Sequence, residues 1–412
     1  FVVVGLIDLP GQIAVDLPAG GLVVLLGLFV PLALLVSGVL LLLSGYAKSY
    51  KEYQIYFFPV IWVFLVPALA AGVPGMELRS AVAFAPLAGV AVAVREVMTG
   101  DFDWPFLAIA FLSTGAAAWA SVVAASRTLS TERLISTAEL DEADLVGGAA
   151  LFPRYVLTWF GGLWVALLLI SLWFGEALGL RGQVVVNLVG LFLGGSLLML
   201  RHYRLPVREA LALRAPHPLV WPAVLVGAPA ALITGLGVSH LAQYVFPVPE
   251  RLLESFGQYL SPEALPLWQV VLFLAVLPGV CEEIAFRGVL LHGLKGRLRP
   301  VALALAAGAV FGLFHVSLFR IVPTAYLGTI LAAVVLITGS IYPAMLWHAL
   351  NNAAALVPAR QGWVQPEQEL PAWVYAGAVV ALAWAFSVLW RVRRPLPGVK
   401  GWTKARPGRV GA

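Results

Sequence analysis

Three short runs of polar residues interrupt apolar stretches in the second half of the chain. The first, LPGVCEEIAFRGVLL over 277–291, contains Glu282, Glu283 and Arg287. On a helix, Glu283 and Arg287 are four residues apart and can pair, whereas Glu282 projects about 100° away from Glu283. An ionisable side chain inside a membrane span costs about 2.5–3.5 kcal/mol, so these residues are candidates for function.

The other two runs contribute histidine and asparagine. GAVFGLFHV places His315 four residues after Phe311, and YPAMLWHALNN places His348 and Asn352 four residues apart, on one face of a helix. Each of these features alone has a structural explanation, because intramembrane histidine and asparagine often join helices by hydrogen bonds. Their combination on three apolar segments within residues 282–352 favours a shared site.

A depth estimate supports bringing these runs together. Glu282 lies before the basic connection at Lys295, and His315 lies after it, each about 20 Å along its helix. If the two helices are antiparallel neighbours, Glu282 and His315 therefore lie at the same depth in the membrane. His348 matches less well, because it follows the short turn near Ser340 by only about two helical turns.

The chemistry that these residue types allow is hydrolysis by an activated water. A carboxylate beside another carboxylate, in a poorly hydrated site, suits a general base that works near neutral pH. Neutral histidine can share that task, and a histidine and an asparagine on one face can donate hydrogen bonds to an oxyanion. The alternative is a zinc ion held by Glu282, His315 and His348. No HExxH sequence is present, so we expect no required cofactor.

The composition places these residues in a membrane. The chain has 412 residues, of which 61% are hydrophobic and 11% charged, and its mean hydropathy is +0.93. Soluble domains are about one-quarter charged, so we predict an all-α, polytopic membrane protein. Its net charge of +5 fits basic inner loops and gives no indication of nucleic-acid binding.

Apolar runs long enough to cross a bilayer recur along the sequence. We predict eleven transmembrane helices near 22–45, 55–72, 104–125, 155–174, 183–200, 219–243, 268–292, 300–318, 322–338, 342–358 and 371–390. The stretch 81–94 is weaker, because Pro86 interrupts it and Arg95 and Glu96 end it.

The distribution of basic residues orients these spans. The tail after residue 390 is basic and contains no acidic residue, which predicts a cytoplasmic C-terminus. Counting back, the connection around Lys295 also falls inside. Lys48 and Lys51 fall inside only if 81–94 does not cross, so we predict a re-entrant or interfacial segment there. The polar stretch 126–154 is the best domain boundary.

In order and spacing, these motifs resemble the CPBP family of intramembrane proteases, the type II CAAX prenyl endopeptidases and Abi-like proteins. The resemblance rests on EExxxR (Glu282, Glu283 and Arg287), FxxxH (Phe311 and His315) and HxxxN (His348 and Asn352). The family has an eight-helix core with these motifs on its fourth, fifth and seventh helices. The spans predicted from residue 155 onward have the same arrangement.

The resemblance implies a glutamate-dependent intramembrane endopeptidase that is a hydrolase of membrane-embedded or lipidated peptides. It implies that Glu282 and His315 activate the water, that His348 and Asn352 form the oxyanion hole, and that Glu283 and Arg287 orient the site. The family has also been described as metal-dependent, as a metalloendopeptidase would be.

The first third resembles a different family. YAKSYKEYQIYFFPVIWVFLVPALAAGVPGMEL, followed by APLAGVAVAVREVMTG, is similar to the C-terminal half of a sodium-exporting ABC-2 permease over 46–135. That family has a re-entrant hairpin before its last span. The early permease spans do not occur here, so we expect an N-terminal part to be missing. No Walker A sequence is present, so a transporter would need a separate ATPase subunit.

We therefore expect a permease-like region over 1–135, a polar linker over 136–154, a protease domain over 155–392 and a basic tail over 393–412. Two functional hypotheses follow. The first is a membrane protease attached to part of a transporter. The second is a permease subunit whose protease-like half serves in binding or assembly. Either protein would be integral to a membrane, and we expect the bacterial plasma membrane.

Overall fold

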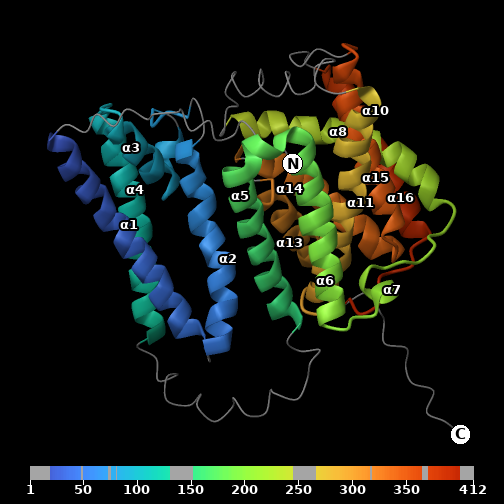
Figure 1. Cartoon of the computed structure of the whole chain (residues 1–412), viewed down its shortest axis with the longest axis horizontal. Helices are drawn as coiled ribbons and strands as arrows, with labels where there is room; N and C mark the ends of the chain where they lie inside the picture. The colour runs from blue at the N-terminus through green and yellow to red at the C-terminus, as the bar shows by residue number, and fades with distance from the viewer. Residues whose placement is uncertain are drawn as a thin grey trace, which may run out of the picture. The chain divides into compact units, whose positions relative to one another are not determined.

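The computed structural model of the chain is helical (Figure 1). It describes residues 19–47, 50–72, 76–79, 81–129, 152–244, 266–315, 318–363 and 370–399. Within these ranges the structure contains no strand, which confirms the all-α class. The chain divides into two compact units, one ending at Gly161 and the other beginning at Gly162. The predicted linker falls almost entirely outside the described residues.

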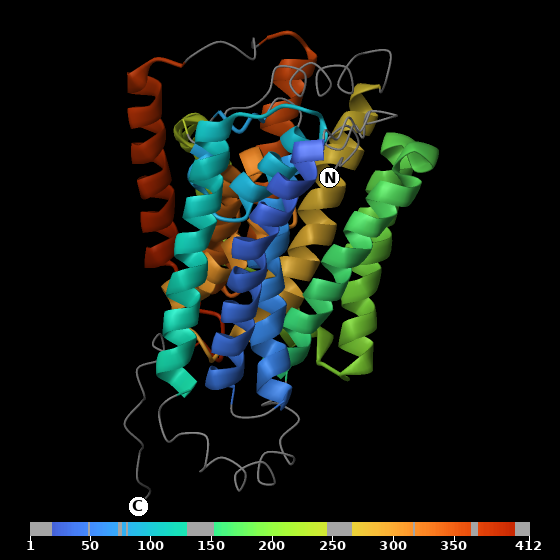
Figure 2. The same cartoon turned by 90° about the vertical axis from the view of Figure 1, so that its left-hand side faces the viewer.

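The first unit is built on two long apolar helices that lie side by side, α1 and α4 (Figures 1 and 2). Gly38 allows their close approach, since a Cβ atom there would lie 3.0 Å from the Val122 side chain. A buried cluster of Leu35, Leu87 and Ala118 joins these helices to the shorter pieces. The elements of the unit are α1 (Ala19–Tyr46), α2 (Tyr50–Ala68), η1 (Leu69–Gly72), η2 (Ala81–Phe84), α3 (Ala88–Met98) and α4 (Trp104–Leu129).

The weak apolar stretch 81–94 forms two short helices, η2 and α3. Leu87 separates them with a φ of 71°, which an α-helix does not accommodate. The 11 residues of α3 extend about 16 Å, whereas the hydrocarbon core of a bilayer is about 30 Å thick. This length agrees with the expectation that the stretch does not cross, and its re-entrant placement stays a prediction.

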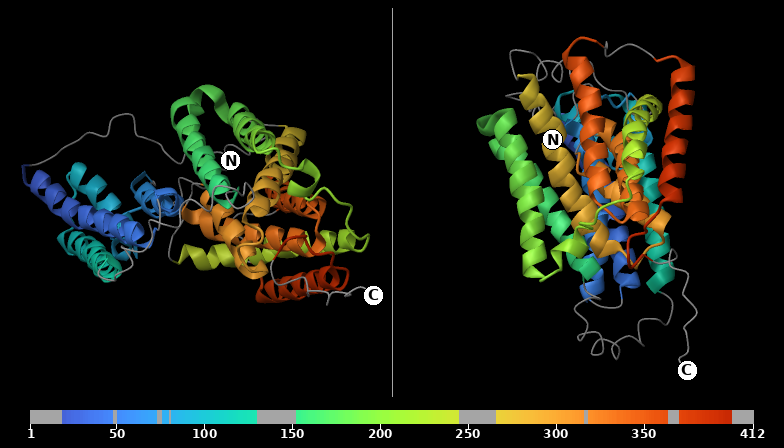
Figure 3. Two further views of the ribbon diagram at one scale, coloured as in Figure 1. Left: turned by 90° about the horizontal axis from the view of Figure 1, so that it is seen from below. Right: turned by 90° about the vertical axis from the view of Figure 1, so that its right-hand side faces the viewer.

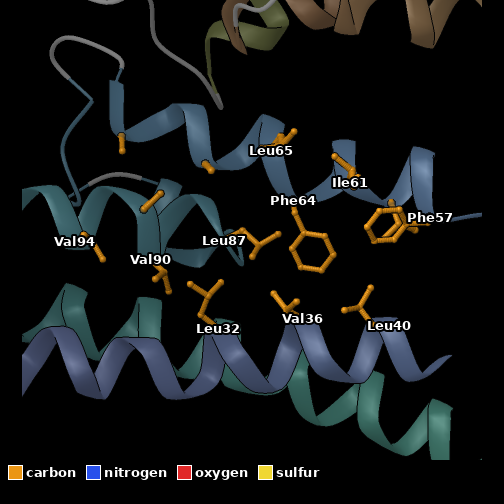
Figure 4. A pocket seen from close by; sticks show the side chains of 14 residues that line it. Leu32, Val36, Leu40, Phe57, Ile61, Phe64, Leu65, Leu87, Val90 and Val94 are labelled. Carbon is orange, nitrogen blue, oxygen red and sulfur yellow. The ribbon is translucent and has the colours of Figure 1, made fainter. Parts of the chain in front are cut away.

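A cavity of about 630 Å³ lies within the first unit, between α1, α2, η1 and α3 (Figure 4). The side chains of Val36, Phe64 and Leu87 point into this space. The lining offers water no hydrogen-bond partner from a side chain. It consists of Leu32, Val36, Leu40, Phe57, Val60, Ile61, Phe64, Leu65, Ala68, Ala71, Leu87, Val90, Ala91 and Val94.

The second unit contains the helices that carry the three polar motifs. One continuous rod runs through five consecutive elements: α10 (Leu267–Val271), η6 (Leu272–Val276), α11 (Leu277–Glu283), η7 (Ile284–Leu290) and α12 (Leu291–Leu294). It lies beside η5 and α6 (Figures 1 and 3). The other elements are α5 (Phe152–Val185), η5 (Val186–Gly194), α6 (Gly195–His202), α7 (Val207–Ala210), α8 (Val220–Gln243), α13 (Pro300–Leu313), α14 (Leu318–Thr338), α15 (Tyr342–Arg360) and α16 (Ala372–Arg391).

Seven helices among the described residues are long and apolar enough to cross a membrane, so the protein is an integral membrane protein. They are Gly20–Tyr46, Trp104–Arg127, Ala177–His202, Val220–Gln243, Leu267–Leu294, Arg320–Thr338 and Ala372–Arg391. The sequence predicted eleven. Two of the four others fall in helices that are shorter or more polar: α13 has only 14 residues, and α15 contains His348, Asn351 and Asn352.

Small residues bring α13 and α14 into direct backbone contact. A Cβ atom on Gly308 would lie 2.6 Å from the Ala325 carbonyl oxygen, and one on Gly312 would lie 2.6 Å from the Ile321 carbonyl oxygen. Without a hydrophobic force between helices inside a bilayer, such close packing is what holds them together. The hairpin therefore places the end of α13 against the beginning of α14.

The turn between α14 and α15 is buried rather than at the surface. Ser340 and Ile341 are fully buried. The segment after α16 covers this turn, because the Arg394 and Leu396 backbone nitrogens donate to carbonyls at the end of α14. Gly339 has a φ of 63°, and a Cβ atom there would lie 2.4 Å from the Arg394 carbonyl oxygen. A glycine is therefore required at this turn.

Candidate active site

The two glutamates lie on α11, a seven-residue α-helical stretch between the π-helical segments η6 and η7. Such π-helical turns occur frequently at functional sites. Pro278 is the second residue of this stretch. Gly279 follows, where a Cβ atom would lie 3.0 Å from the Met345 carbonyl oxygen and from the Ala349 nitrogen of α15. This contact brings Glu282 and Glu283 against the face of α15 that carries His348.

Glu283 is the centre of a buried hydrogen-bond network. Arg287 Nη1 donates to Glu283 Oε1 at 2.9 Å, which is the pair expected from their spacing. His348 Nδ1 lies 2.9 Å from the same oxygen. Arg287 Nη2 also donates to the Gly328 carbonyl of α14 at 2.9 Å. The ion pair of Glu283 and Arg287 thereby connects the rod to both α14 and α15.

This network fixes the orientation of His348. A carboxylate oxygen only accepts hydrogen bonds, so His348 Nδ1 carries the proton. Its other ring nitrogen, Nε2, then faces Glu282, whose Oε2 is 3.9 Å away. Within the described residues, Glu282 Oε2 has no hydrogen-bond partner although it is buried. A buried acceptor without a partner is costly, and in a native site it indicates a function.

His315 lies two residues after the end of α13, and its ring contacts the Phe311 ring. Its ring centroid is 4.9 Å from that of Phe311, and the Phe311 centroid is 5.8 Å from that of His348. His315 Nδ1 is 3.0 Å from the Phe311 carbonyl oxygen, so Nδ1 carries the proton and Nε2 presents a lone pair. The guanidinium of Arg287 lies over the same aromatic ring at 4.4 Å.

Asn352 lies one helical turn beyond His348 and is half-buried. Its Nδ2 donates to the Leu274 carbonyl in η6 at 3.2 Å. An amide group has two N–H donors, so one remains for a substrate oxygen. The structure thus brings Glu282, Glu283, Arg287 and His348 together directly. His315 contacts the Phe311 ring, which also contacts His348. Asn352 is hydrogen-bonded to the rod at Leu274.

The depth estimate from the sequence matched His348 less well, and the structure gives the reason. The estimate assumed that the turn near Ser340 lies at the membrane surface, whereas this turn is buried beneath the segment after α16. A turn inside the protein brings His348 level with Glu283 after fewer residues.

Sequence reasoning missed two contributors. Phe311 was considered only as part of a motif, yet its ring contacts both histidines. Arg320, in the first turn of α14, interacts electrostatically with Glu282 and His315. The sequence feature that could have identified Arg320 is its charge, because it is a single cation between two apolar runs.

The alternative set of zinc ligands does not fit this geometry. Among the described residues, no three His, Cys, Asp or Glu side chains group so that they could hold a metal ion. We therefore derive no step through a metal.

Fold and site together define a helical membrane protein with a buried cluster of glutamate, histidine and arginine. Residues 264–354 match the family model described as Type II CAAX prenyl endopeptidase Rce1-like. That segment contains all six predicted site residues, and it is an Rce1-like domain of a family of membrane proteases. The match covers a minor part of the 412 residues and does not reach the permease-like region. The chain has no match among curated proteins or among solved structures.

The approach of α11 to α15 gives a first test. Gly279→Val places branched carbons where even a single Cβ atom would lie 3.0 Å from the α15 backbone. Moving α15 away lengthens the bond between His348 and Glu283, and misplacement of about 1 Å in a site can cost a hundred-fold in rate. We expect at least about a hundred-fold lower peptidase activity, measured as kcat/KM on a cleaved peptide.

The matched control is Gly377→Val in α16, where a Cβ atom meets nothing within 4 Å. This variant should keep activity within about two-fold of the wild type, as is usual for a substitution without a contact. Equal activity of the two variants would contradict the packing argument.

Proposed function

We propose that the protein is an intramembrane endopeptidase that hydrolyses peptide bonds with a water activated by Glu282 and His315. The observation that supports this best is the orientation of His348, whose Nδ1 is held by Glu283 while Nε2 faces Glu282. A buried base with an unsatisfied oxygen next to an oriented imidazole is a suitable arrangement for water-mediated acyl transfer.

The reaction proceeds in two steps. Glu282 accepts a proton from the water while the water oxygen adds to the scissile carbonyl carbon. The π electrons of the carbonyl move to the carbonyl oxygen. His315 Nε2 accepts the second hydrogen bond of that water and orients it. The C–N bond then breaks, and the leaving nitrogen takes the proton from Glu282. One water is consumed, and a carboxyl group and an amine are formed.

The oxyanion of the intermediate requires donors. Asn352 offers its remaining N–H. His348 donates from Nε2 when both of its ring nitrogens carry a proton. Glu283 and Arg287 act through His348 as positioning residues, because their contacts fix its ring and join it to α14.

The substrate class that we propose is a membrane-embedded or lipidated peptide, with a prenylated CAAX-type tail as one member. We also propose the bacterial plasma membrane as the location, with the basic residues after α16 on the cytoplasmic side. The permease resemblance of 46–135 stays a hypothesis. It predicts that an ATPase subunit copurifies with the full chain, whereas a protease alone needs none.

The test is cleavage by the purified full chain in lipid nanodiscs, with farnesylated and unmodified peptides as probes. In water enriched with oxygen-18, we expect one heavy oxygen in the new carboxyl group of each cut, detected by mass spectrometry. A chelator such as 1,10-phenanthroline should leave the rate unchanged. Inhibition that added Zn²⁺ reverses would count against the metal-free mechanism, and no cleavage of either peptide would contradict the proposed function.

A further inference from the structure

Asn187, on η5, is a buried polar residue that the proposed mechanism does not use. Its side chain is fully buried. Among the described residues, neither its Oδ1 nor its Nδ2 has a hydrogen-bond partner. Burying a polar group without a partner is unfavourable, so such a residue in a native structure requires an explanation.

The packing places Asn187 at the level of Glu282. η5 contacts α11 and η7, and α6, which follows η5, contacts η7. Earlier parts of the two segments therefore meet each other, as do later parts, so the segments run in the same direction. The rings of Phe192 and Phe286 give the register, because their centroids are 5.5 Å apart. Asn187 precedes Phe192 by five residues and Glu282 precedes Phe286 by four, so each lies about 6–8 Å back from this contact.

The winding of both segments turns these two side chains toward each other. Glu282 and Phe286 are four residues apart and share one face of the rod. η5 is a π-helix, in which residues five apart lie nearly one above the other, so Asn187 shares the face of Phe192. In an α-helix, the same five residues would turn the side chain about 140° away. The π-helical segment therefore directs Asn187 toward Glu282.

A water between the two side chains would satisfy both. No direct hydrogen bond joins them, and Glu282 Oε2 is also buried without a partner among the described residues. A buried water makes about three hydrogen bonds to polar groups that otherwise lack them. Asn187 Nδ2 can donate to the water oxygen, and the water can donate to Glu282 Oε2. The third bond is the one to His315 Nε2 in the proposed mechanism.

We infer that Asn187 is a catalytic residue whose amide holds the hydrolytic water against Glu282. This inference rests on the proposed function and adds a fixed position for its nucleophile. Nδ2 donates to one lone pair of the water oxygen, and the other lone pair stays directed to the scissile carbonyl carbon. No covalent bond to Asn187 forms or breaks, and both protons of the water go where the proposed mechanism sends them.

The experiment compares the wild type with Asn187→Leu on one peptide that the wild type cleaves, in lipid nanodiscs. Leucine has the branched shape of asparagine without its polar atoms. We expect a kcat about ten- to a hundred-fold lower and a KM within about three-fold, because the amide contacts the water and not the peptide. The midpoint of thermal unfolding should stay or rise, since two unsatisfied polar atoms are removed. Asn187→Val, which is smaller, should give the same loss, so that overpacking by leucine does not decide the result.

The matched control is Gln183→Leu, the same change to a buried amide about one helical turn earlier and farther from the level of Glu282. It should keep kcat within about three-fold. Asn187→Ser should retain part of the rate, because a hydroxyl still donates and accepts. In a Glu282→Gln background, Asn187→Leu should lower kcat by less than about two-fold, since the water has already lost its base.

A high-resolution density map of the wild type provides a readout besides activity. We expect a water within hydrogen-bond distance of Asn187 Nδ2 and Glu282 Oε2, and its loss in Asn187→Leu. A wild-type map without this water, a wild-type kcat in Asn187→Leu, or a full additional loss in the Glu282→Gln background would each overturn the inference. No cleavage by the wild type would instead overturn the proposed function and the catalytic role with it, whereas the map still tests the water site.

Discussion

Glu282→Gln is expected to lower kcat by about a hundred- to ten-thousand-fold, the contribution of a general base. Glutamine has the size of glutamate and can still accept a hydrogen bond, but it cannot take a proton from water. In the structure, the Glu282 side chain is 2% exposed and its Oε2 has no hydrogen-bond partner among the described residues. The variant should therefore fold at least as well as the wild type, because a neutral amide is less costly to bury than a charge.

The measurement pairs initial rates with the midpoint of thermal unfolding in the same nanodiscs. Loss of activity at an unchanged or higher midpoint is the expected combination. Glu96→Gln is the matched control, because Glu96 is a buried carboxylate of α3 in the first unit. It should leave the rate unchanged. Cleavage by Glu282→Gln within ten-fold of the wild type would remove Glu282 from the role of base.

Arg287→Met is expected to lower the free energy of unfolding by about 3–5 kcal/mol, the cost of leaving a buried charge without its partner. The guanidinium contacts the carboxylate of Glu283, the Gly328 carbonyl and the Phe311 ring. All three contacts disappear together, and Glu283 stays buried with only His348 as a partner. Activity should fall as well, since the ring of His348 loses its fixed position.

A second variant separates the charge from the packing. In Glu283→Gln combined with Arg287→Met, both charges of the ion pair are removed together, and a glutamine oxygen still accepts the hydrogen from His348 Nδ1. We expect this double variant to regain most of the lost stability but little of the activity. Chemical unfolding in detergent measures the first quantity and peptide cleavage the second. A double variant less stable than Arg287→Met would show that packing, and not the buried charge, determines the loss.

The six predicted site residues divide into two groups with different consequences. Glu282, His315 and Asn352 are expected to act on the water or the oxyanion, so changing them should affect rate more than stability. Glu283 and Arg287 connect the rod, α14 and α15, so changing either should affect both. His348 belongs to both groups, because it is held by one glutamate and faces the other.

The sequence by itself determined the class of protein and the local pairs. An apolar chain that must satisfy its backbone inside lipid forms helices, and the described residues are helical. A separation of four residues places two side chains on one helix face wherever the helix lies. The pair of Glu283 and Arg287 was therefore predictable from spacing alone, as was the common face of His348 and Asn352.

The tertiary structure alone decided which residues meet across helices. Whether His348 contacts Glu282 or Glu283 depends on where α15 crosses α11, and this crossing is set by the close approach at Gly279 and by the buried turn at Gly339. The bond from Asn352 to Leu274 and the position of Arg320 depend on the same register. No periodicity in the sequence encodes such distances, because they result from how the backbones of separate helices pack.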